Sequence, residues 1–251
     1  MMVGVESLSR VIFLSNAIPK SGSTLLFSLQ AELLRGAAGL HPYDYDFLDQ
    51  RDFPNNRGFV ADTTHPDFVA MLEDGVAEQG PILVKLHARV EGALLEAIAS
   101  QPGVAMSLIL RDPIDVVLSA RDHFRNRGQF HDFRTLERGI LTANTTFRAI
   151  FRSAVRASQE TELRILRYED LLVDPTGTTL ASLPPWLYDL VSNAGGTSLI
   201  DYERARRQSR HQLHTGALRR DASKLSSGEL ALLTEGLAPL RREMGYGNGG
   251  D

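Results

Sequence analysis

Short apolar runs alternate along this chain with longer segments whose hydrophobic residues recur at helical spacing. The runs with the length of buried parallel strands are 11–14, 82–86, 105–110 and, more weakly, 163–167. Helical patterns are found directly after Gly22, at 67–79, at 91–100, from Pro113 onward and at 133–157. This alternation predicts an α/β fold with a doubly wound, mainly parallel sheet, right-handed crossovers and ligands bound at the carboxyl ends of the strands.

Three segments interrupt the pattern. Residues 39–59 mix aromatic and acidic side chains. This composition suits a substrate-binding loop or lid, and it equally suits a surface segment that packs its own aromatic side chains. Residues 174–185 are rich in Gly, Thr, Ser and Pro and predict a second loop, and 245–251 predict a flexible tail. With these segments included, we expect residues 1–251 to form one domain.

Composition narrows the class of protein. The 251 residues are 43% hydrophobic, enough for a full core, and the net charge of −4 argues against a general nucleic-acid or membrane-surface binder. The absence of cysteine excludes thiol redox chemistry and fits a reducing compartment. With no signal-like start and no long apolar run, we expect a cytoplasmic protein.

The loop after the first apolar run predicts a phosphate cradle. Ala17-Ile18-Pro19-Lys20-Ser21-Gly22-Ser23-Thr24 joins a strand to a helix, so backbone N–H groups and the positive end of the helix dipole face an anion. The loop is P-loop-like but departs from G-x-x-x-x-G-K-[ST]. Ala17 replaces the first glycine, Ser23 stands at the lysine position and Lys20 lies earlier, in mid-loop. A strand-to-helix turn without special purpose is the alternative.

The displaced lysine changes the expected chemistry. An ammonium at Lys20 would face the bridging oxygen of a bound nucleotide, where negative charge develops as the terminal group leaves. Magnesium is less necessary when that group carries a single charge, as a sulfuryl group does. The loop therefore favours transfer from a nucleotide other than a triphosphate.

A second anion site is predicted after the run 105–110. Asp112 can cap the following helix and Pro113 can occupy its first turn, which fixes Arg111 at the carboxyl end of the strand. The planar guanidinium suits a phosphate monoester, and Ser119 on the helix can add a hydrogen bond. A surface ion pair is the alternative for this arginine taken alone.

The run 82–86 leads into the candidate base. Lys85 and His87 lie two residues apart, on one side of an extended strand that ends at the same crevice. His87 can accept the proton of an attacking hydroxyl, and Lys85 can help to hold the transferred group. A structural histidine is the alternative. No metal site is expected, since His211 and His214 lack a third ligand.

The chain resembles the sulfotransferases that use 3′-phosphoadenosine 5′-phosphosulfate (PAPS). Lys20-Ser21-Gly22-Ser23-Thr24 is similar to their 5′-phosphosulfate loop, and Arg111 through Ser119 is similar to their 3′-phosphate motif. Tyr168-Glu169-Asp170-Leu171 resembles an element whose tyrosine lies near the adenine. His214-Thr215-Gly216 stands where the family has R-K-G, a loop that folds over the nucleotide. Leu25 occupies the place of a tryptophan that stacks on adenine in many members.

The resemblance implies transfer of a sulfuryl group from PAPS to a hydroxyl or amine of a small-molecule acceptor by in-line displacement. It implies catalytic roles for Lys20, Lys85 and His87. The other residues that it assigns to nucleotide binding are Ser21, Gly22, Ser23, Thr24, Leu25, Arg111, Ser119, Tyr168, His214, Thr215 and Gly216. No metal cofactor, nucleic acid or membrane is implied, and a homodimer is one option for the assembly. The alternatives are an atypical small-molecule kinase and an inactive nucleotide-binding module.

Overall fold

The computed structural model describes residues 11–38, 59–60, 62–74, 82–125, 135–195 and 225–247. Its sheet has the strand order β2-β1-β3-β4, and every pairing is parallel. The strands are β1 (Ile12–Ala17), β2 (Ile82–Leu86), β3 (Val104–Leu110) and β4 (Arg164–Arg167). All four apolar runs are therefore strands, as the sequence predicts.

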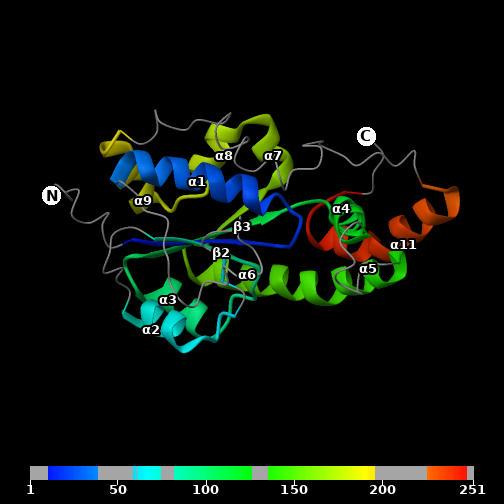
Figure 1. Ribbon diagram of the computed structural model, residues 1–251, viewed down its shortest axis with the longest axis horizontal. Coiled ribbons are helices and arrows are strands. Elements are labelled where there is room, and N and C mark those ends of the chain that lie inside the picture. Colours follow the sequence, from blue (N-terminus) through cyan, green and yellow to red (C-terminus); the bar gives the residue numbers. More distant parts are fainter. Residues whose placement is uncertain are drawn as a thin grey trace.

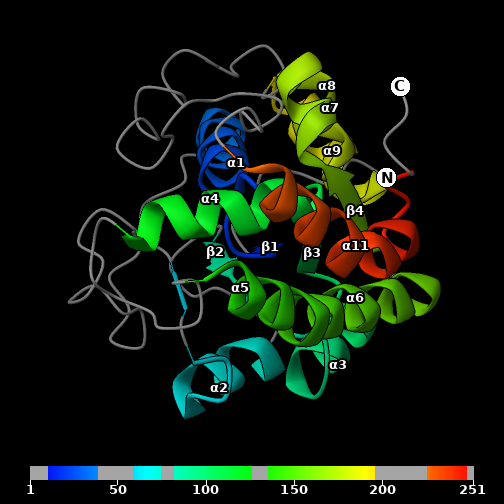
Figure 2. The ribbon, with the colours of Figure 1, turned by 90° about the vertical axis from the view of Figure 1, so that its right-hand side faces the viewer.

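Helices cover both faces of the sheet, which confirms the doubly wound α/β fold. In Figures 1 and 2 one side carries α1 (Ser23–Ala38), α7 (Tyr168–Val173), α8 (Pro175–Ala181) and α9 (Pro185–Asn193). The opposite side carries α2 (Pro66–Asp74), α3 (Ala93–Ser100) and α6 (Arg148–Glu160). Beyond the carboxyl ends of the strands lie α4 (Pro113–Arg125), α5 (Leu136–Thr142) and α11 (Ser227–Glu243). The expected long helix at 133–157 is α5 and α6 joined by a π-helical turn, Ala143–Phe147.

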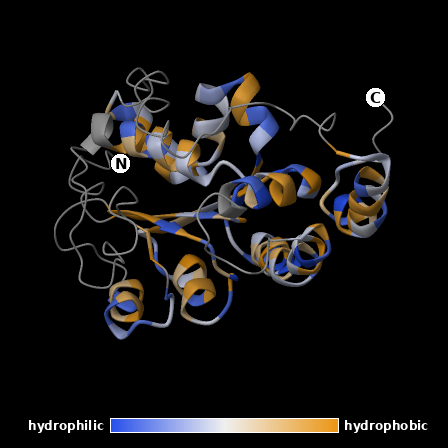
Figure 3. Ribbon diagram, turned by 45° about the vertical axis from the view of Figure 1, so that its right-hand side comes forward, coloured by the Kyte–Doolittle hydropathy of each residue, from blue (hydrophilic) through white to orange (hydrophobic). Residues whose placement is uncertain are grey.

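Alternate strand residues join hydrophobic clusters on opposite faces of the sheet, as a sheet buried on both faces requires. Ile12 and Leu14 of β1 belong to the cluster shared with α2, α3 and α6, whereas Phe13 belongs to the cluster shared with α1 and α9. Figure 3 shows the strands as predominantly apolar between helices with mixed faces. The hydrophobic pattern thus fixes which helix lies on which side.

Two expectations about irregular segments are wrong in part. The segment 174–185 is not a loop, because it contains α8 and the start of α9. Asp174 caps α8 by accepting a hydrogen bond from the Gly177 N–H at 2.9 Å, and a proline follows at the first helical position. The tail expected from Gly245 contains Tyr246, which is 9% exposed. Residues 39–58 of the expected lid lie outside the described part of the chain.

The chain order creates a switch point between β1 and β3. From β1 the chain moves to β2 on one side, and from β2 it crosses to β3 on the other side of β1. Crossovers that leave neighbouring strands in opposite directions open a crevice at their carboxyl ends, and ligands of such sheets bind there. Both predicted anion-binding segments follow these two strands.

Candidate active site

The loop after β1 turns sharply into α1. The Ser21 N–H donates to the Ile18 carbonyl at 3.1 Å across a turn with Pro19 at its second position and Lys20 at its third. Lys20 has a φ of 68°, and it is the single non-glycine with positive φ in the part of the chain that the structure describes. Such a conformation costs on the order of 1 kcal/mol and points to a functional constraint. A left-handed residue among right-handed ones directs successive N–H groups toward one point, as in an anion-binding nest.

The floor of the loop is held by buried contacts. The single proton of the Ser21 hydroxyl is shared between two carbonyl oxygens, that of Ile18 at 2.6 Å and that of Ile109 in β3 at 3.0 Å. Gly22, with a φ of 90°, lies so close to Tyr168 that a Cβ atom there would be 2.1 Å from the tyrosine Cδ2. Glycine is required at this position by both the conformation and the close approach. The side chain and the backbone N–H of Ser21 therefore both hold the loop in place.

Lys85 and Thr24 meet across the mouth of the loop. The ammonium Nζ of Lys85 donates to the Thr24 hydroxyl at 2.8 Å, although Lys85 comes from β2 and is only 3% exposed. Burial, and then the charge of Lys20, lower the pKa of Lys85 to about 7. The ammonium groups of Lys20 and Lys85 are thus close enough to repel each other. An anion bound between them would relieve that repulsion.

His87 is positioned by the backbone. Its Nδ1 lies 2.9 Å from the Ala17 carbonyl oxygen, which can only accept, so Nδ1 carries the proton and Nε2 presents a lone pair. Desolvation, followed by the charges of Lys85 and Lys20, lowers the pKa of His87 to about 3, while its bond to Ala17 opposes this shift. The imidazole is therefore neutral near pH 7, as a general base must be.

A residue that the sequence analysis missed joins the two strand ends. Asn16 is fully buried, and its side-chain amide donates to the Ala88 carbonyl at 2.8 Å while its oxygen accepts from the Ala88 N–H at 3.1 Å. The same oxygen accepts from the Ala17 N–H at 2.9 Å. Asn16 thus holds Ala17, whose carbonyl contacts His87, and Ala88, which directly follows His87. Asn16 is the second residue after the apolar run 11–14, and a polar side chain at this strand end was the available signal.

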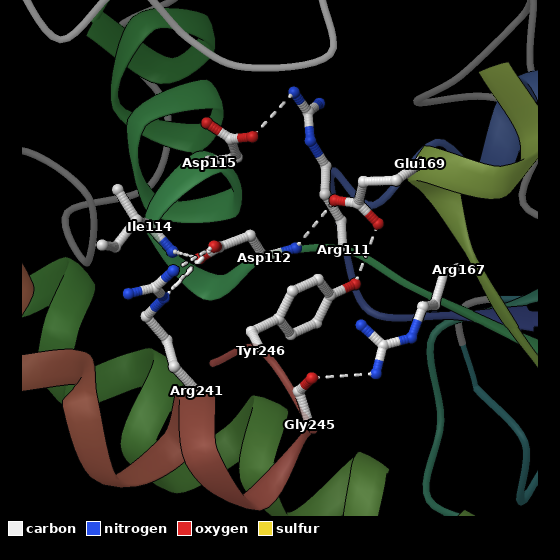
Figure 4. A network of polar contacts seen from close by, with 9 residues as sticks. All are labelled: Arg111, Asp112, Ile114, Asp115, Arg167, Glu169, Arg241, Gly245 and Tyr246. Carbon is white, nitrogen blue, oxygen red and sulfur yellow. Dashed lines mark hydrogen bonds and ion pairs between the residues drawn. The ribbon is translucent and has the colours of Figure 1, made fainter. Parts of the chain in front are cut away.

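The predicted second anion site lies after β3. The Arg111 guanidinium stacks over the Tyr168 ring, 4.4 Å from its centroid. One of its nitrogens lies 3.5 Å from the Asp115 carboxylate of α4 (Figure 4). Ser119 is one helical turn beyond Asp115, so it shares that face of α4. Arg111 and Ser119 are each 6% exposed. Asp112 caps α4 as expected, since its side chain accepts from the Ile114 N–H at 3.0 Å.

The structure brings together most residues that the resemblance assigned to the nucleotide. Loop residues 20–24 follow β1, and Arg111 follows β3. Lys85 lies near the end of β2, and His87 is the first residue after that strand. Leu25 and Tyr168, expected to contact the nucleotide, are each 1% exposed and pack in one hydrophobic cluster beneath the loop. These two side chains support the crevice from below. His214, Thr215 and Gly216, like His211, lie outside the described residues.

Two further observations concern metals and membranes. Within the described segments, no group of three or more His, Asp or Glu side chains is arranged to hold a metal ion. None of the helices in those segments combines the length and the apolar character that a bilayer span requires.

Comparison with known proteins gives a structural answer only. No family model and no curated protein sequence matches the chain. A crystal structure of retinol dehydratase in complex with androsterone and the inactive cofactor PAP aligns with a TM-score of 0.53 and 14% identity, over 92% of this chain and 80% of that one. Mouse sulfotransferase SULT7A1 complexed with PAP aligns with a TM-score of 0.53 and 12% identity, over 95% of this chain and 88% of that one. The chain therefore has the fold of the PAPS-dependent sulfotransferases.

Proposed function

We propose that this protein is a sulfotransferase that moves a sulfuryl group from PAPS to a hydroxyl or amine of a small-molecule acceptor. One observation carries the proposal. The strained Lys20 loop, the Lys85–His87 pair and Arg111 arise from three different strand ends and converge on the switch point of a fold shared with PAP-bound proteins. Two separated cationic positions suit a nucleotide with a phosphate at each end of its ribose.

The mechanism assigns a task to each group. His87 Nε2 takes the acceptor proton as the acceptor oxygen or nitrogen forms its bond to sulfur. The bond between sulfur and the bridging oxygen breaks, and PAP leaves with the extra negative charge on its 5′-phosphate. Lys20 stabilises that charge, and Lys85 and Thr24 hold the group in transfer. The remaining loop N–H groups, including that of Gly22, and the Ser23 hydroxyl bind the 5′-phosphate, and Arg111 and Ser119 bind the 3′-phosphate.

The surroundings of the base favour an apolar or aromatic acceptor. The Phe59 ring packs against His87 with their centroids 5.4 Å apart, and Phe59 pairs with Lys85 beyond the edge of β2. An apolar wall beside the base gives van der Waals contact to an acceptor ring and excludes water. Androsterone, which accompanies PAP in the retinol dehydratase structure, is an apolar small molecule and supports the same class.

The kinase alternative needs a carboxylate that is available for magnesium at a strand end. Asp112 is the carboxylate directly after β3, but both of its oxygens accept from the Arg241 guanidinium and one also caps α4. Asp112 is therefore committed to structure. The absence of cysteine fits a protein of a reducing compartment, and we include a cytoplasmic location in the proposal.

The test is calorimetry with PAP followed by assays with sulfur-labelled PAPS and a panel of phenols, sterols, alcohols and amines. We expect PAP binding without magnesium, and turnover that continues with a chelator present. Lys20→Ala should slow transfer by about a thousandfold with the fold intact, because it removes one charge pair of about 4 kcal/mol. Arg111→Ala should mainly weaken PAP binding. Absence of PAP binding by the wild-type protein would refute the proposal, and turnover of ATP that needs magnesium would favour the kinase.

A further inference from the structure

The C-terminal arm, defined as α11 and residues 244–247, is attached to the turns that carry the anion-binding residues. The Arg241 guanidinium makes a two-pronged contact with Asp112, with Nε–O distances of 3.1 Å and an Nη2–Oδ2 distance of 2.8 Å. The Tyr246 hydroxyl donates to Glu169 Oε2 at 3.0 Å. Arg167 donates to the Gly245 carbonyl at 3.0 Å and stacks 4.6 Å from the Tyr246 ring centroid. Figure 4 shows these contacts as one network.

The network ends on the residues directly next to Arg111 and Tyr168 in the sequence. Asp112 follows Arg111, and Glu169 follows Tyr168. Arg111 and Tyr168 stack on each other, while Asp112 and Glu169 face the arm and are joined by a hydrogen bond from the Asp112 N–H to Glu169 Oε1 at 3.3 Å. The residue after Arg111 is thus held at its backbone nitrogen and at both carboxylate oxygens.

These contacts differ from ordinary attachment of a terminal helix. Leu233, Leu237 and Leu240 of α11 are already fully buried in the core, and they suffice to dock the helix. The polar contacts instead fix the turns that follow β3 and β4. The contact of the Arg241 guanidinium with both carboxylate oxygens restricts the position of Asp112. Burial raises the pKa of Tyr246, so its hydroxyl stays a donor to Glu169.

We propose that Arg241 and Tyr246 are positioning residues that orient Arg111 toward the 3′-phosphate of the nucleotide. This inference rests on the proposed function and adds that the C-terminal arm controls how well a 3′-phosphorylated nucleotide is told apart from one without that group. The arm acts through Asp112 and Glu169 and does not itself touch the nucleotide.

The test compares two nucleotides on conservative variants of the full chain. Tyr246→Phe removes one hydroxyl, and Arg241→Lys keeps the charge but not the fork. Calorimetry with PAP should show binding weakened by about three- to tenfold in each variant, the range expected for residues that act through a neighbour. Binding of adenosine 5′-phosphate, which lacks the 3′-phosphate, should change by less than about twofold.

Arg152→Ala is the matched control. Arg152 of α6 pairs with Glu243 of the same arm, away from the strand ends, so its loss loosens the arm without touching Asp112 or Glu169. We expect wild-type PAP binding for this variant. Equal weakening of both nucleotides in the Tyr246 and Arg241 variants, or unchanged PAP binding, would overturn the inference. If the wild-type protein binds no PAP, the proposed function fails first and this inference fails with it.

Discussion

At the scale of single residues, His87 gives the sharpest expectation. Its Nδ1 is committed to the Ala17 carbonyl, so Nε2 is the atom that takes the acceptor proton in the proposed mechanism. His87→Ala should lower the rate of sulfuryl transfer by about 10²- to 10⁴-fold, the usual contribution of a general base, and should leave PAP affinity nearly unchanged. Single-turnover rates and calorimetry on the same samples measure both. His65→Ala removes a half-exposed imidazole near Asp67 and serves as the control with wild-type activity. Transfer by His87→Ala at a rate close to that of the control would rule out the assignment.

The pKa of the same histidine predicts the pH profile. It lies at about 3 in the free protein because of desolvation and two nearby ammonium groups, and the charge of a bound donor raises it. The acid limb of kcat/KM reports the free protein and that of kcat reports the complex. The limb for kcat should therefore lie at higher pH. Coincident limbs at the ordinary pH for histidine would contradict the lowered pKa of His87 in the free protein and its rise on donor binding.

The pKa of Lys85 predicts that the affinity for the nucleotide falls at high pH, whereas that of His87 predicts a loss of rate at low pH. Its pKa is about 7 in the free protein, and a bound phosphate favours the charged form, so binding raises this pKa. PAP affinity should be constant below about pH 7 and fall as pH rises above it, because the free protein then has to take up a proton on binding. Titrations over this range in Lys85→Met should be flatter. A wild-type affinity independent of pH would contradict a charged Lys85 at the phosphate.

At the scale of elements, the turn from β1 into α1 depends on the fit between Gly22 and Tyr168. Gly22→Ala places a Cβ atom 2.1 Å from the Tyr168 ring at a φ of 90°, and the ring is itself covered by Arg111. We expect a loss of about 2 kcal/mol or more in the free energy of unfolding, with PAP binding lost as well. Gly92→Ala is the matched control, since Gly92 has a φ of 56° but nothing within 4 Å of the added atom. It should cost about 1 kcal/mol from conformation alone. Equal effects in denaturant melts would show that the Tyr168 contact does not constrain the loop.

At the scale of the whole molecule, the sequence predicts the sheet better than the contacts between distant segments. Four apolar runs identify the strands because buried parallel strands are continuous in hydrophobicity, and the placement of Lys20, His87 and Arg111 at strand ends follows from that. Helix α8 is missed because Gly, Thr and Pro resemble a loop until Asp174 is seen to cap it. Arg241 and Tyr246 are missed as contributors because their partners are fixed only by the fold. Asn16 and Asp115 are missed too, although Asn16 is a polar residue at a strand end and Asp115 stands at helical i+4 spacing from Arg111.

A nucleotide that reaches both anion-binding segments would join the ends of β1, β2 and β3, and so should stabilise the molecule as one unit. At 100 times the dissociation constant, PAP should add about 2.7 kcal/mol to the free energy of unfolding, which corresponds to a rise of about 5–10 °C in Tm for a chain of this size. Scanning calorimetry with PAP and with adenosine 5′-phosphate at equal concentration separates the two anion sites. The 5′-phosphate alone should give the smaller shift because it engages the Lys20 loop and not Arg111. The PAP shift should also shrink with added salt, since the net charge of −4 offers no general attraction and binding depends on local ion pairs. Equal shifts for the two nucleotides would mean that Arg111 and Ser119 do not form a second phosphate site.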